Sequence, residues 1–82
     1  GQSNKEIDMN KIELETGFSE FHGKGIIWCG KDTKKVSLEN LLHHIDLFSI
    51  EFTDSIPAVE DGKVIGHARK VIGGKAWVVY VQ

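Results

Sequence analysis

Four histidines and one cysteine are the side chains of this sequence that best suit metal binding or covalent catalysis: His22, Cys29, His43, His44 and His67. Zinc and related ions are held by closely spaced pairs, such as C-x-x-C or two histidines four residues apart on a helix. Neither pattern occurs in the sequence, and the adjacent His43 and His44 would point about 100° apart on a helix. The spacing therefore predicts no metal site and no cofactor.

Cys29 with His67 is the one combination that would support nucleophilic catalysis. A catalytic thiolate needs a neighbouring histidine and a third group that orients this histidine. Cys29 stands in the apolar run 25–30, where a free cysteine is typically a small buried hydrophobic residue. We therefore expect no enzymatic activity, and a small enzyme with a Cys/His site is kept as an alternative.

The dipeptide Gly73-Gly74 separates two runs rich in β-branched and aromatic residues, 64–72 and 75–82. This pattern predicts a β-hairpin with a two-residue primed turn. The implied register pairs Gly66 with Val81, His67 with Tyr80, and Arg69 with Val78. Because side chains alternate across a strand, one face of the hairpin should belong to the core. The core-facing set is Val64, Gly66, Ala68, Lys70, Trp77, Val79 and Val81.

The opposite face of the hairpin carries the predicted binding site, which consists of Ile65, His67, Arg69, Val78 and Tyr80. Tyrosine and arginine are enriched at the centres of protein interfaces. The sequence thus predicts a small non-enzymatic module (an inhibitor, an adaptor or an antitoxin-like protein) that binds a partner protein. The alternative is a nucleic-acid-binding domain that uses the basic and aromatic side chains of the hairpin, Trp77 among them. A net charge of −2 and a pI of 6.1 disfavour this alternative, because such domains are usually basic.

Residues 37–48 have the pattern of an amphipathic helix. Ser37 is placed to cap the first turn, and the i, i+3, i+4, i+7 spacing gives one apolar stripe. We expect this stripe in the core, whereas Leu47 should be exposed. The stripe consists of Leu38, Leu41, Leu42, Ile45 and Phe48. Alternating or apolar runs predict strands at 11–16 and 25–30, and Asp61-Gly62 predicts a second hairpin.

The order of these elements predicts an α+β fold, in which a small, mostly antiparallel sheet has one central helix packed on one face. This order resembles that of ubiquitin-like β-grasp proteins; the resemblance is one of element order and implies no activity. Residues 1–10 lack apolar periodicity and are expected to form a disordered tail, which leaves residues 11–82 as a single domain. An edge strand of the sheet would also allow self-association.

The composition limits the compartment and the kind of partner. No apolar run approaches the roughly 20 residues of a membrane span, so we expect no membrane partner. A single cysteine cannot form an internal disulfide, which favours a reducing compartment and a cytoplasmic location. The charge is unevenly distributed, with six acids and no Lys or Arg in residues 39–61, and four bases and no acid in residues 63–82. Such segments either attract each other or present a face of one sign to a partner.

Overall fold

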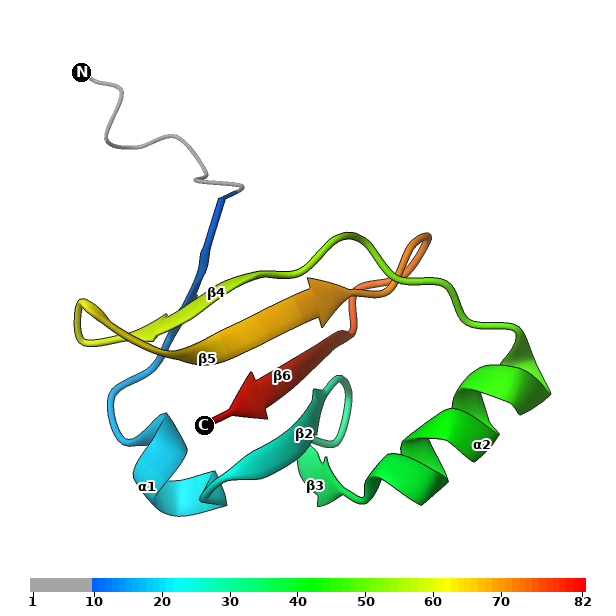
Figure 1. Cartoon of the computed structure of the whole chain (residues 1–82), viewed down its shortest axis with the longest axis horizontal. Helices are drawn as coiled ribbons and strands as arrows, with labels where there is room; N and C mark the ends of the chain where they lie inside the picture. Colours follow the sequence, from blue (N-terminus) through cyan, green and yellow to red (C-terminus); the bar gives the residue numbers. More distant parts are fainter. Residues whose placement is uncertain (1–9) are drawn as a thin grey trace.

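Six strands form one sheet in the computed structural model, which describes residues 10–82. The elements are β1 (Ile12–Leu14), α1 (Phe18–His22), β2 (Gly25–Cys29), β3 (Lys34–Val36), α2 (Leu38–Phe48), β4 (Ile56–Glu60), β5 (Lys63–Lys70) and β6 (Trp77–Val81). The strand order is β1-β4-β5-β6-β2-β3 (Figure 1). Only the β1–β4 pair is parallel within this sheet, so the predicted α+β class with a mostly antiparallel sheet is confirmed. The tail predicted for residues 1–10 lies, apart from Asn10, outside the described residues.

The C-terminal hairpin has the predicted register. β5 and β6 pair Gly66 with Val81, His67 with Tyr80, and Arg69 with Val78. The loop differs from the prediction, because the last bond across the hairpin joins Val71 N–H to Ala76 O at 2.9 Å. Of the two glycines only Gly73 has a positive φ, of 82°. The connection is therefore longer than a two-residue primed turn, which would put both glycines at its centre.

The β4–β5 hairpin turns at Asp61-Gly62, as predicted. Both residues have positive φ angles, 52° and 78°, as a type I′ turn requires at its two central positions. Glu60 and Lys63 face each other on either side of this turn. The register shifts between Ala58 and Val59, which marks a bulge in β4 close to the turn.

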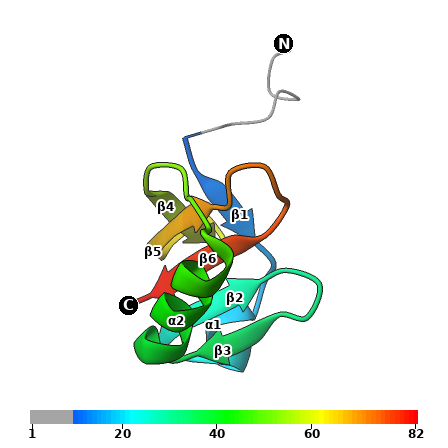
Figure 2. The ribbon, with the colours of Figure 1, turned by 90° about the vertical axis from the view of Figure 1, so that its right-hand side faces the viewer.

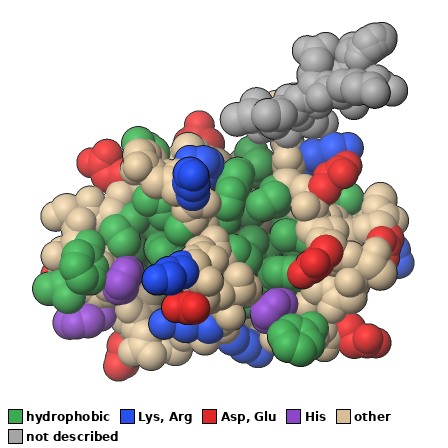
Figure 3. Space-filling model, turned by 180° about the vertical axis from the view of Figure 1, so that it is seen from behind, with side chains coloured by type: hydrophobic (Ala, Val, Ile, Leu, Met, Phe, Trp, Pro, Cys, Tyr) green, Lys and Arg blue, Asp and Glu red, His purple; other side chains and the backbone are tan. Residues whose placement is uncertain are grey.

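One face of the sheet holds the core. Ile27 and Val79 pair across β2 and β6 and are fully buried. Ala58 and Ala68 are also buried and belong to the same core cluster. Phe18 of α1 closes this cluster from outside the sheet. Figure 3, seen from behind relative to Figure 1, shows hydrophobic side chains gathered over the middle of the molecule with charged groups around them.

The predicted core-facing set of the hairpin is right except at its far end. Four of its residues are buried: Gly66, Ala68, Val79 and Val81. Lys70 and Trp77, which pair with each other, are half-buried. Val64 is exposed, because it lies beside the Asp61-Gly62 turn and does not belong to the core cluster.

Helix α2 begins where the sequence predicts but does not lie in the core. Its first turn is capped by Ser37, whose Oγ accepts the Asn40 N–H at 3.1 Å. The prediction that its apolar stripe is core is wrong: none of its residues is buried, and Leu38, Leu42 and Phe48 are 58, 55 and 62 % exposed. Leu41 and Ile45 are half-buried, and Leu47 is exposed as expected.

The position of α2 follows from its connection to the sheet. A single residue, Ser37, separates β3 from α2, and β3 is an edge strand. The helix therefore starts after the edge strand and extends past the ends of β2 and β6, instead of crossing the middle of one face (Figure 1 and Figure 2). The expected central helix packed on one face is thus only roughly matched, and Phe18 of the short α1 contributes to the core instead.

Candidate binding surface

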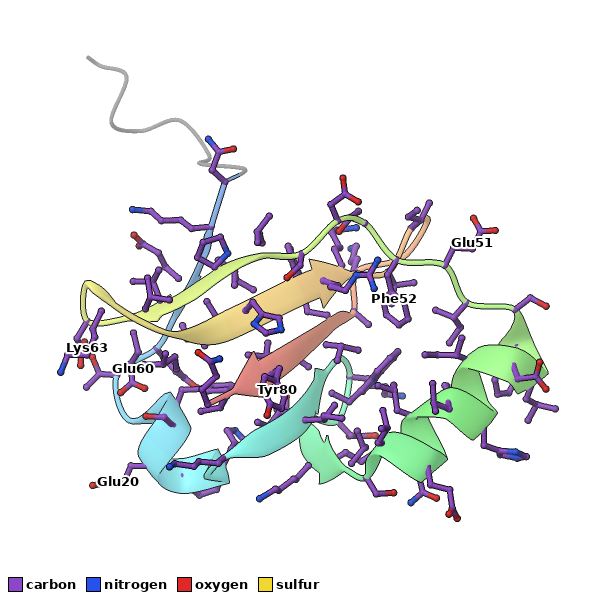
Figure 4. The ribbon with its side chains drawn as sticks, in the orientation of Figure 1. Glu20, Glu51, Phe52, Glu60, Lys63 and Tyr80 are labelled. Atoms are coloured by element: carbon purple, nitrogen blue, oxygen red, sulfur yellow. The ribbon has the colours of Figure 1, made fainter. Side chains whose placement is uncertain are left out.

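Four of the five predicted binding residues lie together on the side of the hairpin opposite to the core. His67, Arg69 and Tyr80 are exposed and Val78 is half-buried. The His67 and Tyr80 rings touch, with their centroids 5.3 Å apart. The fifth residue, Ile65, packs against the edge of the core cluster, so it is not part of the open surface. Figure 4 shows Tyr80 near the middle of the sheet, where β6 runs next to β2.

The exposed side of the hairpin continues across β2 and β3. Tyr80 pairs with Ile26, and Ile26 pairs in turn with Val36. In the next row, Val78 pairs with Trp28, and Trp28 with Lys34. We call this surface the platform; it consists of His67, Arg69, Val78, Tyr80, Ile26, Trp28, Lys34 and Val36. Sequence reasoning missed Trp28, because the apolar run 25–30 indicates a strand buried on both faces.

No carboxylate belongs to the platform. Its basic members are His67, Arg69 and Lys34, and Tyr80 and Trp28 are its exposed or half-buried tyrosine and tryptophan. Trp77, which the nucleic-acid alternative assigned to the binding face, lies on the core side and packs against the core cluster. The aromatic group that accompanies Tyr80 is therefore Trp28.

Arg69 also has a structural role. Its Nε donates to the backbone oxygen of Thr53 at 2.8 Å, and its guanidinium carbon lies 6.0 Å from the centre of the Phe52 ring. The Thr53 N–H donates in turn to Lys70 O at 2.8 Å. These contacts fix the segment between α2 and β4, whose Glu51 and Phe52 are labelled in Figure 4. Truncation of Arg69 would thus disturb the fold as well as the surface.

Helix α2 borders the platform. The His44 ring meets the Trp28 ring edge to face, with centroids 5.6 Å apart, and it also touches the Phe48 ring at 4.8 Å. The helix also exposes three large apolar side chains, Leu38, Leu42 and Phe48, which we call the exposed helix stripe. The sequence located these apolar residues but not their surroundings, because the spacing of apolar residues predicts an apolar face and not what covers it.

Glu60, which belongs to the acidic segment, serves the fold. Its Oε2 accepts the Gly17 N–H at 3.0 Å, and its Oε1 accepts the Ser19 N–H at 3.0 Å and the Ser19 hydroxyl at 2.6 Å. The Ser19 hydroxyl, the Ser19 N–H and the Gly17 N–H together lower the pKa of the Glu60 carboxyl, because all three bonds favour its charged form. The carboxylate therefore ties β4 to the start of α1.

The alternative of a Cys/His catalytic site is not supported by the sheet register. Cys29 pairs with Trp77, which faces the core, whereas His67 pairs with Tyr80 on the platform. Burial raises the pKa of the Cys29 thiol, so the reactive thiolate is disfavoured. Between residues 10 and 82, no group of three or more His, Cys, Asp or Glu side chains is arranged to hold a metal ion.

The two edges of the sheet are β1 and β3. β3 carries Lys34 and Lys35, and lysines on an edge strand disfavour pairing with a second copy. No helix in the described part of the chain has the length and apolarity that crossing a membrane requires. Neither a scan against protein-family models nor searches of curated proteins and of solved structures find a match for this chain.

Proposed function

We propose that this protein is a non-enzymatic module that binds a partner protein through the platform and the exposed helix stripe. The observation that carries the proposal is the exposure of three large apolar side chains on one helix. Leu38, Leu42 and Phe48 of α2 are more than half exposed, and Tyr80 of the platform is 41 % exposed. Phe48 connects the helix to the platform, because its ring touches His44, whose ring meets Trp28. Clustered exposed apolar surface of this kind is typical of protein interaction sites.

The chemistry of the surface fits a protein interface. Aromatic residues and arginine are enriched where protein interfaces are most buried, and Tyr80, Trp28 and Arg69 lie within one sheet face. Burial of apolar area stabilises a complex by roughly 25 cal/mol per Å². The exposed helix stripe would supply such area, and the polar groups of the platform would form the surrounding rim.

A capture experiment with matched variants tests this proposal. The tagged chain is used to capture partners from native lysate, and the partners are identified by mass spectrometry. Leu42→Asp and Tyr80→Ala should abolish or weaken the capture of a specific partner. Phe21→Asp is the matched control, because Phe21 is an 84 % exposed apolar residue on the other helix. Circular dichroism of each variant establishes that it is folded.

The affinity of the identified partner then gives the quantitative result. Tyr80→Ala should weaken binding by about 1–3 kcal/mol, the range of an interface hot spot. Wild-type affinity in both Leu42→Asp and Tyr80→Ala would refute the proposal. Loss of binding in Phe21→Asp alone would move the interface to α1.

A second candidate function is the binding of single-stranded nucleic acid. The observation that favours it is the absence of carboxylates from the platform, where Tyr80 and Trp28 accompany Arg69 and Lys34. Bases stack on aromatic side chains exposed on a sheet, and cationic groups bind the phosphates. The net charge of −2 opposes this function. Fluorescence anisotropy of labelled oligonucleotides, measured from low to physiological salt, distinguishes the two candidates, since only nucleic-acid binding weakens steeply with salt.

A further inference from the structure

A pocket of about 420 Å³ lies between the β2–β3 edge of the sheet and helix α2. Trp28 and Lys34 contribute from the sheet, Ser37 and Asn40 from the start of the helix, and His43 and His44 from its middle. None of the residues that line the pocket is acidic, although Asp32 and Glu39 are close to them in the sequence. The pocket therefore combines an aromatic group with groups that favour a negative charge.

The aromatic group is held in place by its neighbours. A Cβ on Gly30 would lie 2.7 Å from the indole Nε1 of Trp28, so the missing side chain of Gly30 gives the indole its space. The His44 ring supports the indole from the helix side at 5.6 Å between centroids. Trp28 is thus positioned before any ligand arrives, which lowers the entropic cost of stacking a flat ring against it.

Lys34 is the lysine best placed to meet an anion in this pocket. It pairs with Trp28 across β2 and β3, which puts both side chains on the same side of the sheet. Lys35 also lines the pocket, but the Cε and Nζ of its side chain lie next to Gly25 on the other side of the sheet. The start of α2 adds its N-terminal dipole to the charge of Lys34, and the two histidines add donors along the helix.

We propose that this pocket binds a nucleoside phosphate, with the base against Trp28 and the phosphate near Lys34 and the histidines. Every nucleobase offers a flat face for stacking, and a phosphate matches a lysine placed in the same pocket. The volume is within the range of small-molecule sites and leaves room for a sugar between base and phosphate. The site shares Trp28, Lys34 and Val36 with the platform, but a small ligand there is a separate function that requires no partner protein.

Isothermal titration calorimetry with small nucleotides tests the proposal directly. The probes are the four common nucleoside 5′-monophosphates, with adenosine and ribose 5-phosphate as fragments that lack the phosphate or the base. At least one nucleotide should bind saturably with a 1:1 stoichiometry, and each fragment should bind at least ten-fold more weakly. The absence of saturable binding by all four nucleotides would overturn the proposal, as would equal binding of ribose 5-phosphate, because the base would then contribute nothing.

Variants and NMR locate the site. Lys34→Ala should weaken nucleotide binding about ten-fold, whereas Lys63→Ala, an exposed strand lysine far from α2 in Figure 4, should leave it unchanged. In ¹H–¹⁵N spectra, nucleotide should shift the indole N–H signal of Trp28, assigned through Trp28→Leu, and not that of Trp77. Equal affinities of Lys34→Ala and Lys63→Ala, or a shift of the Trp77 signal alone, would place the ligand elsewhere and refute the assignment.

Discussion

Gly66→Ala is the substitution for which the structure predicts the largest effect per added atom. Gly66 is buried in the middle of β5, between β4 and β6. A Cβ at this position would lie 1.8 Å from the backbone oxygen of Tyr80 and 3.1 Å from the Cα of Val81. A backbone oxygen cannot rotate away as the end of a side chain can. The two strands would therefore have to separate where the C-terminal hairpin crosses the core.

The expected loss of stability is large for a domain of this size. A chain of 82 residues has a free energy of unfolding of about 4–12 kcal/mol. Overpacking usually costs about 1–3 kcal/mol, and more where the backbone must move. We therefore expect Gly66→Ala to cost at least about 3 kcal/mol, which corresponds to a fall in Tm of at least about 12 °C. Urea denaturation followed by circular dichroism measures the free energy, and a thermal melt measures Tm.

Gly74→Ala is the matched control, because it makes the same chemical change in the loop of the same hairpin. Gly74 does not have a positive φ, and a Cβ there would meet only the Val71 side chain, with its Cγ1 at 3.3 Å and its Cβ at 3.7 Å. Its stability should stay within about 1 kcal/mol of the wild type. If Gly66→Ala were as stable as Gly74→Ala, the close approach of β5 and β6 would be refuted, and with it the packing of the hairpin.

Three further predictions concern the helix, the acid-sensitive contact and the pocket. In urea denaturation, Leu42→Ala should cost less than about 1 kcal/mol and Ile27→Ala about 2–5 kcal/mol. Equal costs would show that Leu42 is buried in the core. Hydrogen bonds lower the pKa of Glu60 below its ordinary value of 4.5, so its stabilising effect is complete above that pH and is lost as the pH falls through the folded-state pKa. Glu60→Gln should thus be less stable than the wild type at pH 7, with a difference that shrinks under acid; a constant difference would contradict this. Gly30→Ala should displace the Trp28 indole and shift its N–H signal in NMR spectra. An unchanged signal would show that Gly30 does not restrict the position of the indole.

Local signals in the sequence determined the Asp61-Gly62 turn, the helix start and the hairpin register, but not the length of the Gly73-Gly74 loop. Asp61-Gly62 forms its turn because glycine tolerates a positive φ without strain and aspartate tolerates it better than most residues. Ser37 caps α2 because its hydroxyl reaches an N–H only three residues away. The hairpin register follows from the position of the Gly73-Gly74 loop together with alternation, since a one-residue slip would turn the core side chains of one strand to the other face. All of these features depend on residues that are close in the sequence.

Only the tertiary structure decided where the apolar stripe of α2 lies. The spacing of Leu38, Leu42 and Phe48 specifies an apolar face but not the surface that meets it. That choice depends on the one-residue link from β3, which holds the helix at an edge, and on Phe18, which closes the core from a different segment. The same holds for Trp28, whose two neighbouring strands, β6 and β3, place it on the platform.

The sequence also predicted only part of the candidate site. The sequence by itself determined that His67, Arg69 and Tyr80 share one side of the hairpin, since alternation along a strand is a local property. It could not determine that Arg69 also holds Thr53, or that Ile65 turns to the core. Nor could it bring Lys34 and Trp28 beside the first half of α2, because the pocket is formed by strands and a helix that meet only when the whole chain has folded.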